Sequence, residues 1–501
     1  MQKLTTIVSI FSILAALFSE TVMAQSDVQP TSSPSALKEA VQAAVLKNPE
    51  VQARWHAFNE ATEEIGVARG GFFPKIDLSA GTGRIKTEQK RINIDNSYHG
   101  NESTVSLRQM LFDGFATSKE VKRLGKAKLV RYFELLDASE NVALEAARAY
   151  LDVIRYREQV KLAEDNYVQH YAAHEQLKRR ASSGVGKRVD VNQAASRLAL
   201  ADVNVTTAYA NLHDVTARYL RIVGANPPKE MDMPERLAPS FPEEEEAALA
   251  VALRQNPALR ASIENIEAAQ YDIDVRRAAF WPRLDLIARR DHYSNYEDNG
   301  SRDESQVQLR LNYNLFNGGS DLARKRQYRE RKNLALDLRE KACRDTRQTL
   351  AIAFNDTLRL NDQLSYLATQ VELVAKTRIA YRDQFNIGQR TLLDLLNTQN
   401  EYFDARRAQV NADVDLSLAY LRSYAGMGRL LEVLDLKHVE IENAPEDGDF
   451  APVDVEQLCL PTAPADTRLN REALMREAKD MSENTGFIGT RAQPAAVPPQ
   501  P

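Results

Sequence analysis

The sequence predicts an elongated, internally duplicated α+β membrane protein, in which long coiled-coil helices carry four β-strands. Three observations lead to this fold class. Sequence motifs recur in the same order at a nearly constant spacing of just over 200 residues. Stretches of about 70 residues contain no proline, little glycine and apolar residues at helical spacing. Two pairs of segments alternate between polar and apolar residues, as the strands of β-hairpins do.

The duplication is visible in three motif pairs. Asn48-Pro49 followed by FFPKIDLSA recurs 208 residues later as Asn256-Pro257 followed by FWPRLDLIA. LFDG recurs as LFNG, and GVGKRVDV recurs as GQRTLLDL, each pair 204 residues apart. Each half is therefore expected to fold as the same unit, with the two units related by a pseudo-symmetry axis.

The first 24 residues have the features of a secretory signal peptide. Lys3 precedes a short apolar run, and Ala24 supplies the small residue before a cleavage site. The run is shorter than the roughly 20 residues that a membrane-spanning helix needs. Residue 25 is Gln25, and with no cysteine near the cut, a lipid anchor on a new N-terminal cysteine is not available. Residues 25–35 are rich in Ser, Pro and Gln and are expected to form a flexible arm.

The first repeat is expected over residues 36–224. A helix over about 37–70 leads into a β-hairpin over 75–112, because Pro74 ends the helix and an alternating pattern begins. A long helix over about 114–184 follows, on the order of 100 Å at 1.5 Å per residue. A second helix over about 188–223 runs back along it.

The second repeat is expected over residues 243–430, after a linker over 225–242. Its hairpin is placed at 283–316, and its long helices at about 320–387 and 392–426. From about residue 431 onward Pro, Ala, Asp and Glu increase and periodicity fades. The C-terminal region 431–501 is therefore expected to be mostly disordered, apart from a short helix near 471–479.

The composition argues against several classes of protein. The net charge of −5 predicts no general affinity for nucleic acid. No nucleotide-binding fingerprint is present, so neither an enzyme nor a cofactor is expected. His170 and His174 are four residues apart on a predicted helix, but no glutamate completes a zinc motif, and a metal site is not expected. Cys343 and Cys459 are the only cysteines, and no disulfide framework is expected from them.

The hairpins constrain how the chain could enter a membrane. Beyond the signal peptide no apolar run is long enough for a membrane helix, so a membrane-embedded chain would have to use β-strands. Four strands are too few to close a barrel, and an open edge in lipid leaves unpaired amides that each cost several kcal/mol. The chain would therefore have to oligomerise. A soluble periplasmic coiled-coil scaffold without a pore is the alternative, but it leaves the repeated hairpins unexplained.

The order of these motifs resembles the TolC family of outer-membrane efflux and secretion channels. The resemblance covers roughly residues 35–430 and is most marked in FNIGQRTLLDLLN, residues 385–397. It implies a homotrimer embedded in outer-membrane lipid, with a twelve-stranded β-barrel and an α-helical periplasmic tunnel that narrows to an iris. It also implies two partners, a periplasmic adaptor (membrane-fusion) protein and an inner-membrane transporter.

The resemblance also suggests residues for the periplasmic gate. Asp394 matches an acidic residue of the constriction, where three copies would form an anionic ring. The second acidic position of the family is Asn397 here, which predicts weaker blockade by cations. Arg390 matches an arginine that pairs with Asp190, and Phe385 stands where a tyrosine is usual. The alternative is that these residues are ordinary members of a solvated helix face.

The two turns between the long helices are the implied docking sites for the adaptor. They contain six residues of interest: Gly184, Val185, Gly186, Ile387, Gly388 and Gln389. Gly184 and Gly388 are equally well explained as helix C-caps. Similarly, the four aromatic residues before the hairpins are compatible with a membrane-interface belt or with a plug at the domain junction: Phe72, Phe73, Phe280 and Trp281.

Two kinds of cargo remain open for such a duct. One is protein in type I secretion, with an ATP-driven ABC transporter. The other is small molecules in drug efflux, with a proton-driven pump. The absence of a cysteine near the expected cut favours the non-lipidated branch, and hence secretion.

Overall fold

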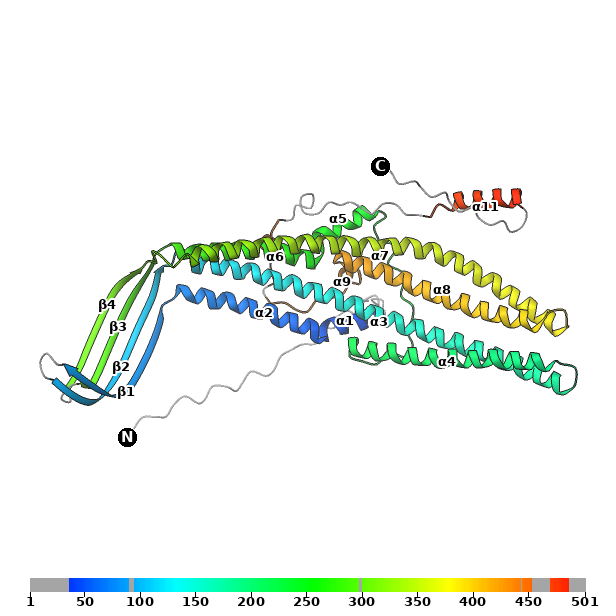
Figure 1. The fold of residues 1–501 in the computed structure, drawn as a ribbon, viewed down its shortest axis with the longest axis horizontal. Helices are drawn as coiled ribbons and strands as arrows, with labels where there is room; N and C mark the ends of the chain where they lie inside the picture. The colour runs from blue at the N-terminus through cyan, green and yellow to red at the C-terminus, as the bar shows by residue number, and fades with distance from the viewer. Residues whose placement is uncertain (1–35, 90–93, 297–299, 443, 453–468, 486–501) are drawn as a thin grey trace, which may run out of the picture.

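The computed structural model describes residues 36–89, 94–296, 300–442, 444–452 and 469–485. The molecule is long and narrow, with a β-sheet at one end and bundled helices along the rest (Figure 1). The predicted signal peptide and arm lie outside the described residues. No helix within these ranges is long and apolar enough to cross a membrane.

The helix predicted over 37–70 is in fact two helices. α1 (Ala36–Lys47) ends before Asn48, and α2 (Pro49–Arg69) begins after it. The Asn48 side chain caps α2 by accepting a hydrogen bond from the backbone N–H of Glu50, and Pro49 has no N–H to donate. The second repeat has the same break between α5 (Glu245–Gln255) and α6 (Pro257–Arg277), where Asn256 is the cap.

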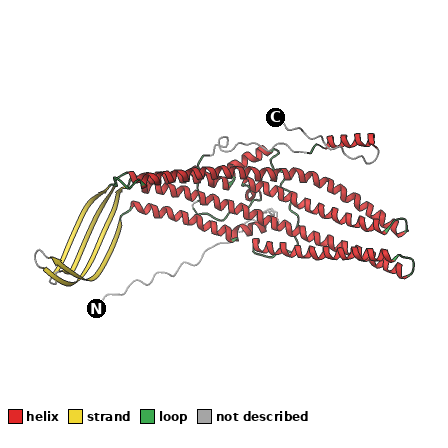
Figure 2. Cartoon of the chain, viewed as in Figure 1, coloured by secondary structure: helices red, strands yellow, loops and turns green. Residues whose placement is uncertain are grey.

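The four strands form one antiparallel sheet in chain order (Figure 2). The first hairpin, β1 (Lys75–Gln89) and β2 (Ile94–Phe112), has the predicted bounds. The second, β3 (Arg283–Tyr296) and β4 (Gly300–Asn312), ends four residues before the expected residue 316. The single turns η1 (Gly70–Phe72) and η2 (Ala278–Phe280) join the helices to the sheet.

The two faces of the sheet differ in chemistry. On the apolar face six large side chains are exposed: Ile76, Leu78, Val105, Val307, Leu309 and Leu311. On the polar face Asp291 is buried and accepts hydrogen bonds from Thr104 at 2.6 Å and from Arg289 at 2.6 Å. Because successive residues of a strand point to opposite faces, the alternation in the sequence becomes this division.

Four long helices extend away from the sheet. α3 (Ala116–Ser182) pairs with α4 (Arg188–Val223), and α7 (Ser320–Asn386) pairs with α8 (Leu392–Met427), within two residues of the predicted bounds. The largest apolar core lies midway along the molecule, where Tyr150 and Tyr424 are fully buried beside α1 and α5. Smaller clusters continue the packing towards the far end.

The C-terminal region is more ordered than predicted over its first 20 residues. α9 (Leu430–Val433) and the segment after it pack on the main core, with Leu434 buried. Trp55 donates to the Glu440 carbonyl at 3.1 Å, and the Ala451 N–H donates to Glu264 at 2.6 Å. These long-range contacts hold a segment that lacks periodicity of its own. Beyond it lie η3 (Asp447–Asp449) and α11 (Arg471–Thr485), the latter longer than expected.

The cysteine prediction was wrong in one respect. Cys343 on α7 is buried and disulfide-bonded. The chain has one other cysteine, Cys459, which lies outside the described residues. Sequence spacing alone did not indicate a bond between a helix and a segment of low periodicity.

Candidate functional site

The candidate site is the tip of the molecule farthest from the sheet, where two short turns connect the long helices (Figure 1). Gly184 (φ +79°) and Gly388 (φ +80°) occupy the left-handed region, which glycine adopts without strain. Gly186 is needed for a different reason, since a Cβ there would lie 2.8 Å from the Ala181 nitrogen. The glycines thus have structural roles whatever else the turns do.

Each turn also presents one apolar side chain to solvent. Val185 is 84% exposed and Ile387 is 69% exposed. Gln389 lies in the second turn, where its N–H donates to the Gln384 carbonyl at 2.8 Å. Two exposed apolar residues on rigid turns form a small protruding surface, which is compatible with docking of a partner.

Asp394 has a clear local role. Thr391 is the N-cap of α8 and accepts a hydrogen bond from the Asp394 N–H, while its hydroxyl donates to the Asp394 carboxylate at 2.8 Å. This reciprocal arrangement is a capping box. The carboxylate also lies in the first helical turn, where the helix dipole favours negative charge. It remains partly exposed, so it keeps its charge available to solvent.

Arg390 is held by its own helical hairpin. Its Nε donates to Gln384 at 3.0 Å, its Nη1 lies 3.7 Å from Asp394, and its guanidinium stacks 4.3 Å from the centre of the Tyr381 ring. The described part of the chain contains no ion pair between Arg390 and Asp190. The predicted pair is therefore not formed within one chain, and a contact between neighbouring copies stays a prediction.

Phe385 stabilises the tip from inside. It is buried with Leu177, Ala194 and Leu396, and the Arg180 guanidinium lies 5.3 Å from its ring centre. The ring thus joins all four long helices in one small apolar cluster. A tyrosine hydroxyl at this buried position would need a hydrogen-bond partner, which phenylalanine does not.

Asn397 connects the two helical hairpins. Its side-chain oxygen accepts a hydrogen bond from Arg197 of α4 at 3.1 Å. Three further polar contacts join α3 to α8 along the same seam: His170 to Asn400 at 3.0 Å, Gln159 to Asn411 at 2.8 Å and Arg155 to Asp415 at 2.5 Å. We call these four contacts the interhairpin seam. The sequence analysis identified Asn397 but missed Arg197 and Asn400, since spacing within one helix does not reveal a partner on another.

His170 is the most unusual member of the seam. It is 2% exposed, and its Nδ1 is buried without a hydrogen-bond partner among the described residues. Burial lowers the pKa of His170 below its ordinary value, although the bond to Asn400 opposes the shift. Nearby Arg197 favours the neutral form as well. Within the described chain no group of three or more metal-binding side chains is present, consistent with the sequence analysis.

Comparison with known proteins identifies the fold and the family. The family model described as outer membrane efflux protein matches twice, over residues 40–225 and 248–429. The chain is 26% identical to outer membrane efflux protein BepC of Brucella suis, over 83% of this chain and 92% of that protein. It is 27% identical to alkaline protease secretion protein AprF of Pseudomonas aeruginosa, over 86% and 93%.

Solved structures agree on the fold. The CmeC outer membrane channel of Campylobacter jejuni superposes with a TM-score of 0.71 at 14% identity, covering 79% of this chain and 86% of that one. The outer membrane protein VceC of Vibrio cholerae superposes with a TM-score of 0.69 at 15% identity, covering 78% and 96%. The double match of the family model corresponds to the duplicated halves. The chain therefore belongs to the family of outer membrane efflux proteins, which are outer-membrane channels and not enzymes.

Proposed function

We propose that the chain forms a homotrimeric exit duct of a tripartite export system and that its cargo is protein exported by type I secretion. The open sheet supports assembly. Within the described strands, β1 pairs only with β2 and β4 pairs only with β3, so both edges present unpaired backbone groups. In the outer membrane these edges need partners from further copies of the chain.

The tip supports the partners in this proposal. Val185 and Ile387 protrude from turns that their glycines hold in fixed conformations. A periplasmic adaptor with a complementary apolar tip would bind there and connect the duct to an inner-membrane ABC transporter. The energy for transport would come from that transporter, because no nucleotide-binding motif occurs in this sequence.

The gate in this proposal is the interhairpin seam together with three copies of Asp394. Opening the tip requires α7 and α8 to move away from α3 and α4, which breaks the hydrogen bonds of Arg197 and His170. The partly exposed Asp394 would then contribute an anionic ring to the entrance. Asn397 carries no charge to add to that ring and is engaged by Arg197.

The choice of cargo is supported by the relatives. AprF is named for secretion of alkaline protease, and the protease secretion protein PrtF of Dickeya chrysanthemi is 24% identical over 74% of this chain. The same comparison favours a second candidate, small-molecule efflux. BepC is named as an efflux protein, and the pyoverdine export protein OpmQ of Pseudomonas aeruginosa is 24% identical over 79% of this chain.

Deletion of the gene, with two readouts from one culture, separates these functions. Loss of one or a few secreted proteins with unchanged sensitivity to dyes, detergents and antibiotics is expected. Hypersensitivity with an intact secreted profile would instead identify an efflux duct, and both effects together would identify a shared exit.

Complementation of the deletion strain then tests the adaptor. Val185→Asp with Ile387→Asp should fail to restore export while still forming trimers in the outer membrane. Val168→Asp, an exposed position midway along α3, is the matched control and should restore export. Export at the wild-type level by the tip variant would exclude these turns as the docking site.

A further inference from the structure

The two hairpins pair their strands in the same register. Lys75 of β1 lies opposite Arg108 of β2, and Arg283 of β3 lies opposite Asn312 of β4. The first partners are 208 residues apart in sequence and the second partners are 204 apart. The same two offsets relate every pair from there to Lys86–Ser97 and Ser294–Ser301. The duplication is thus maintained residue by residue in the sheet.

This equivalence specifies how one copy would pair with the next. β4 corresponds to β2, and β1 corresponds to β3, so the observed β2–β3 pairing is the template for β4 against β1 of a second copy. Ser103 lies opposite His292. Applying the two offsets places Val307 opposite Arg84 of the second copy. By the same step, Asn101 opposite Ser294 places Ser305 opposite Lys86 of the second copy.

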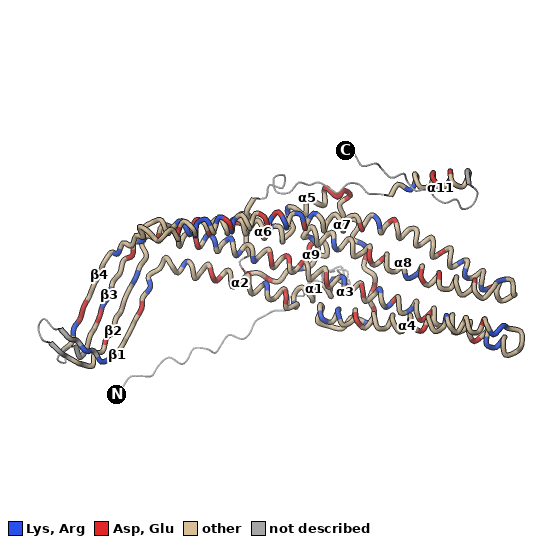
Figure 3. Tube along the Cα trace, in the orientation of Figure 1, with Lys and Arg blue, Asp and Glu red and all other residues tan. Residues whose placement is uncertain are grey.

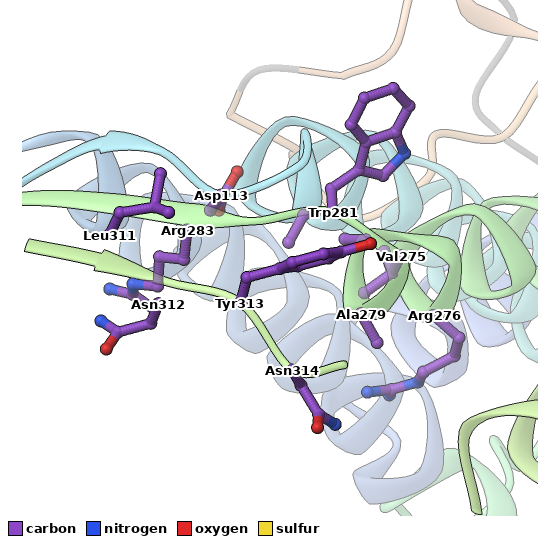
Figure 4. A pocket seen from close by; sticks show the side chains of 12 residues that line it. Asp113, Val275, Arg276, Ala279, Trp281, Arg283, Leu311, Asn312, Tyr313 and Asn314 are labelled. Carbon is purple, nitrogen blue, oxygen red and sulfur yellow. The ribbon is translucent and has the colours of Figure 1, made fainter. Parts of the chain in front are cut away.

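Aromatic residues at the junction with the helices agree with this template. Within the chain, the Phe112 ring lies 6.5 Å from the Trp281 ring. The equivalent residues are Phe316 and Phe73, which are 84% and 66% exposed. Figure 4 shows a hollow lined by Trp281 and Tyr313 where β4 meets the helices. A second copy seated on β4 would bring its Phe73 to Phe316 at this junction.

The apolar face of the sheet changes character towards the loops. Near the helices it carries Leu284, Leu286 and Ala288 on β3, and the next residue on this face is Arg290. Arg290 is exposed and makes no hydrogen bond or ion pair within the described residues. Figure 3 shows further basic residues on the strands away from the helices. Such a change marks the level at which lipid tails give way to headgroups.

Arg84 lies on the same face of β1 as Ile76 and Leu78 and is exposed. Its Nε donates to the Ser97 hydroxyl at 3.1 Å. In one chain Arg84 and Arg290 are separated by β2 and by several residues along the strands. The template changes this, because it places Arg84 of the second copy beside Val307, two residues along β4 from Ser305. Ser305 is itself the partner of Arg290.

We propose that Arg290, together with Arg84 and Lys86 of the neighbouring copy, forms a binding site for the phosphate of an outer-leaflet lipid headgroup. The inference rests on the proposed homotrimer, since one chain holds only part of the site. With strands about 4.8 Å apart, the three basic residues surround β4 at Cα separations of about 10 to 12 Å. Long basic side chains reach across such a gap while their stems cover apolar surface.

The surrounding charges leave this site positive. His292 and Asp303 lie on the same face, one step closer to the loops, and are paired with each other at 2.9 Å. That pair satisfies the nearest described carboxylate. A lipid bound here would contact the apolar face through its acyl chains and the three basic residues through its phosphate, so both parts of the ligand have a complementary surface.

Disulfide trapping tests the register independently of any lipid. Val307→Cys combined with Arg84→Cys should give a covalent trimer on a non-reducing gel, because directly opposed Cβ atoms are within bonding range. Val307→Cys with Thr82→Cys, one step along the same face, is the control and should cross-link poorly. Stronger cross-linking of the control would overturn the register and the site that depends on it.

Lipid binding by the purified trimer tests the site itself. Native mass spectrometry with bisphosphorylated lipid A is expected to show up to three bound lipids per wild-type trimer. Arg84→Gln with Arg290→Gln should reduce binding at least tenfold. Arg290→Gln with Arg310→Gln removes the same charge but retains Arg84, and Arg310 lies on the polar face, so its loss should be smaller.

Two ligand controls define the chemistry. Dephosphorylated lipid A should bind the wild-type trimer as weakly as bisphosphorylated lipid A binds the double variant. Inorganic phosphate should not compete at millimolar concentration, because it lacks the acyl chains. Equal binding of the phosphorylated and dephosphorylated lipids would overturn the proposal. Absence of any trimer would refute the proposed duct, whereas a cross-linked trimer without lipid selectivity would refute only the lipid site.

Discussion

Removal of the Arg197 side chain should destabilise the closed tip. Arg197 of α4 donates to Asn397 of α8 at 3.1 Å, which ties the end of one helical hairpin to the other. Arg197→Ala leaves the helices intact, since alanine has the highest helix propensity. The change therefore acts on the contact between hairpins and not on the hairpins themselves.

The magnitude follows from the number of copies. A hydrogen bond of this kind contributes about 1 kcal/mol net, and the partial exposure of Arg197 argues against a larger value. If the three tips of a trimer open together, the loss is about 3 kcal/mol. Since every 1.4 kcal/mol is a factor of ten, the ratio of open to closed channels should rise roughly 100-fold.

Single-channel recording in a planar lipid bilayer measures this ratio directly. The variant should spend more time in a high-conductance state than the wild type. Arg179→Ala is the matched control, because Arg179 is an exposed arginine near the same tip and should leave gating unchanged. Identical gating of Arg197→Ala and wild type would refute the view that the interhairpin seam holds the tip closed.

Four further predictions follow from buried or paired groups. Because burial lowers the pKa of His170 and keeps it neutral when closed, acidification below about pH 6.5 should favour channel opening, and His170→Gln should reduce that response in the same recordings. Burial raises the pKa of Glu140 to about 7, so the folded state holds a proton that the unfolded state releases above the usual 4.5. Stability should therefore fall by about 3 kcal/mol as pH rises from 4.5 to 7, and urea unfolding of Glu140→Gln should lack most of this slope. Phe385→Ala should cost about 3 kcal/mol of local stability, seen as faster hydrogen exchange at the tip, whereas Phe385→Leu should cost less. If Asp190 and Arg390 pair between copies, alanine at both should raise conductance, and unchanged conductance would exclude the pair.

Much of the architecture was predictable because it depends on local sequence. The four long helices follow from unbroken runs of helix-forming residues, and their ends from Gly184, Gly388 and the residues that cap them. The first hairpin follows from alternation after Pro74. The break at Asn48 was missed, although Asn-Pro is a signal for a helix start, because the apolar spacing continues across it.

The tip was predicted less completely. Its position and its glycines came from the motifs, since a turn between two helices is encoded by consecutive residues. The partners of its polar residues were not predicted. Arg390 turned to Gln384 and Asp394 on its own hairpin, and Asn397 was engaged by Arg197 from 200 residues earlier. Which side chain meets which depends on how two helices are rotated about their axes, and a single sequence does not specify this rotation.

The sequence by itself determined the duplication, the lengths of the helices and strands and the need of an open sheet for further copies. These properties depend on periodicity, on glycine and proline, and on the backbone hydrogen bonds that every strand must complete. Only the tertiary structure decided that residues 434–451 dock on the core, that Cys343 is disulfide-bonded and that four polar contacts join the helical hairpins. Each of these depends on residues far apart in the chain, whose meeting is decided by packing and not by any local pattern.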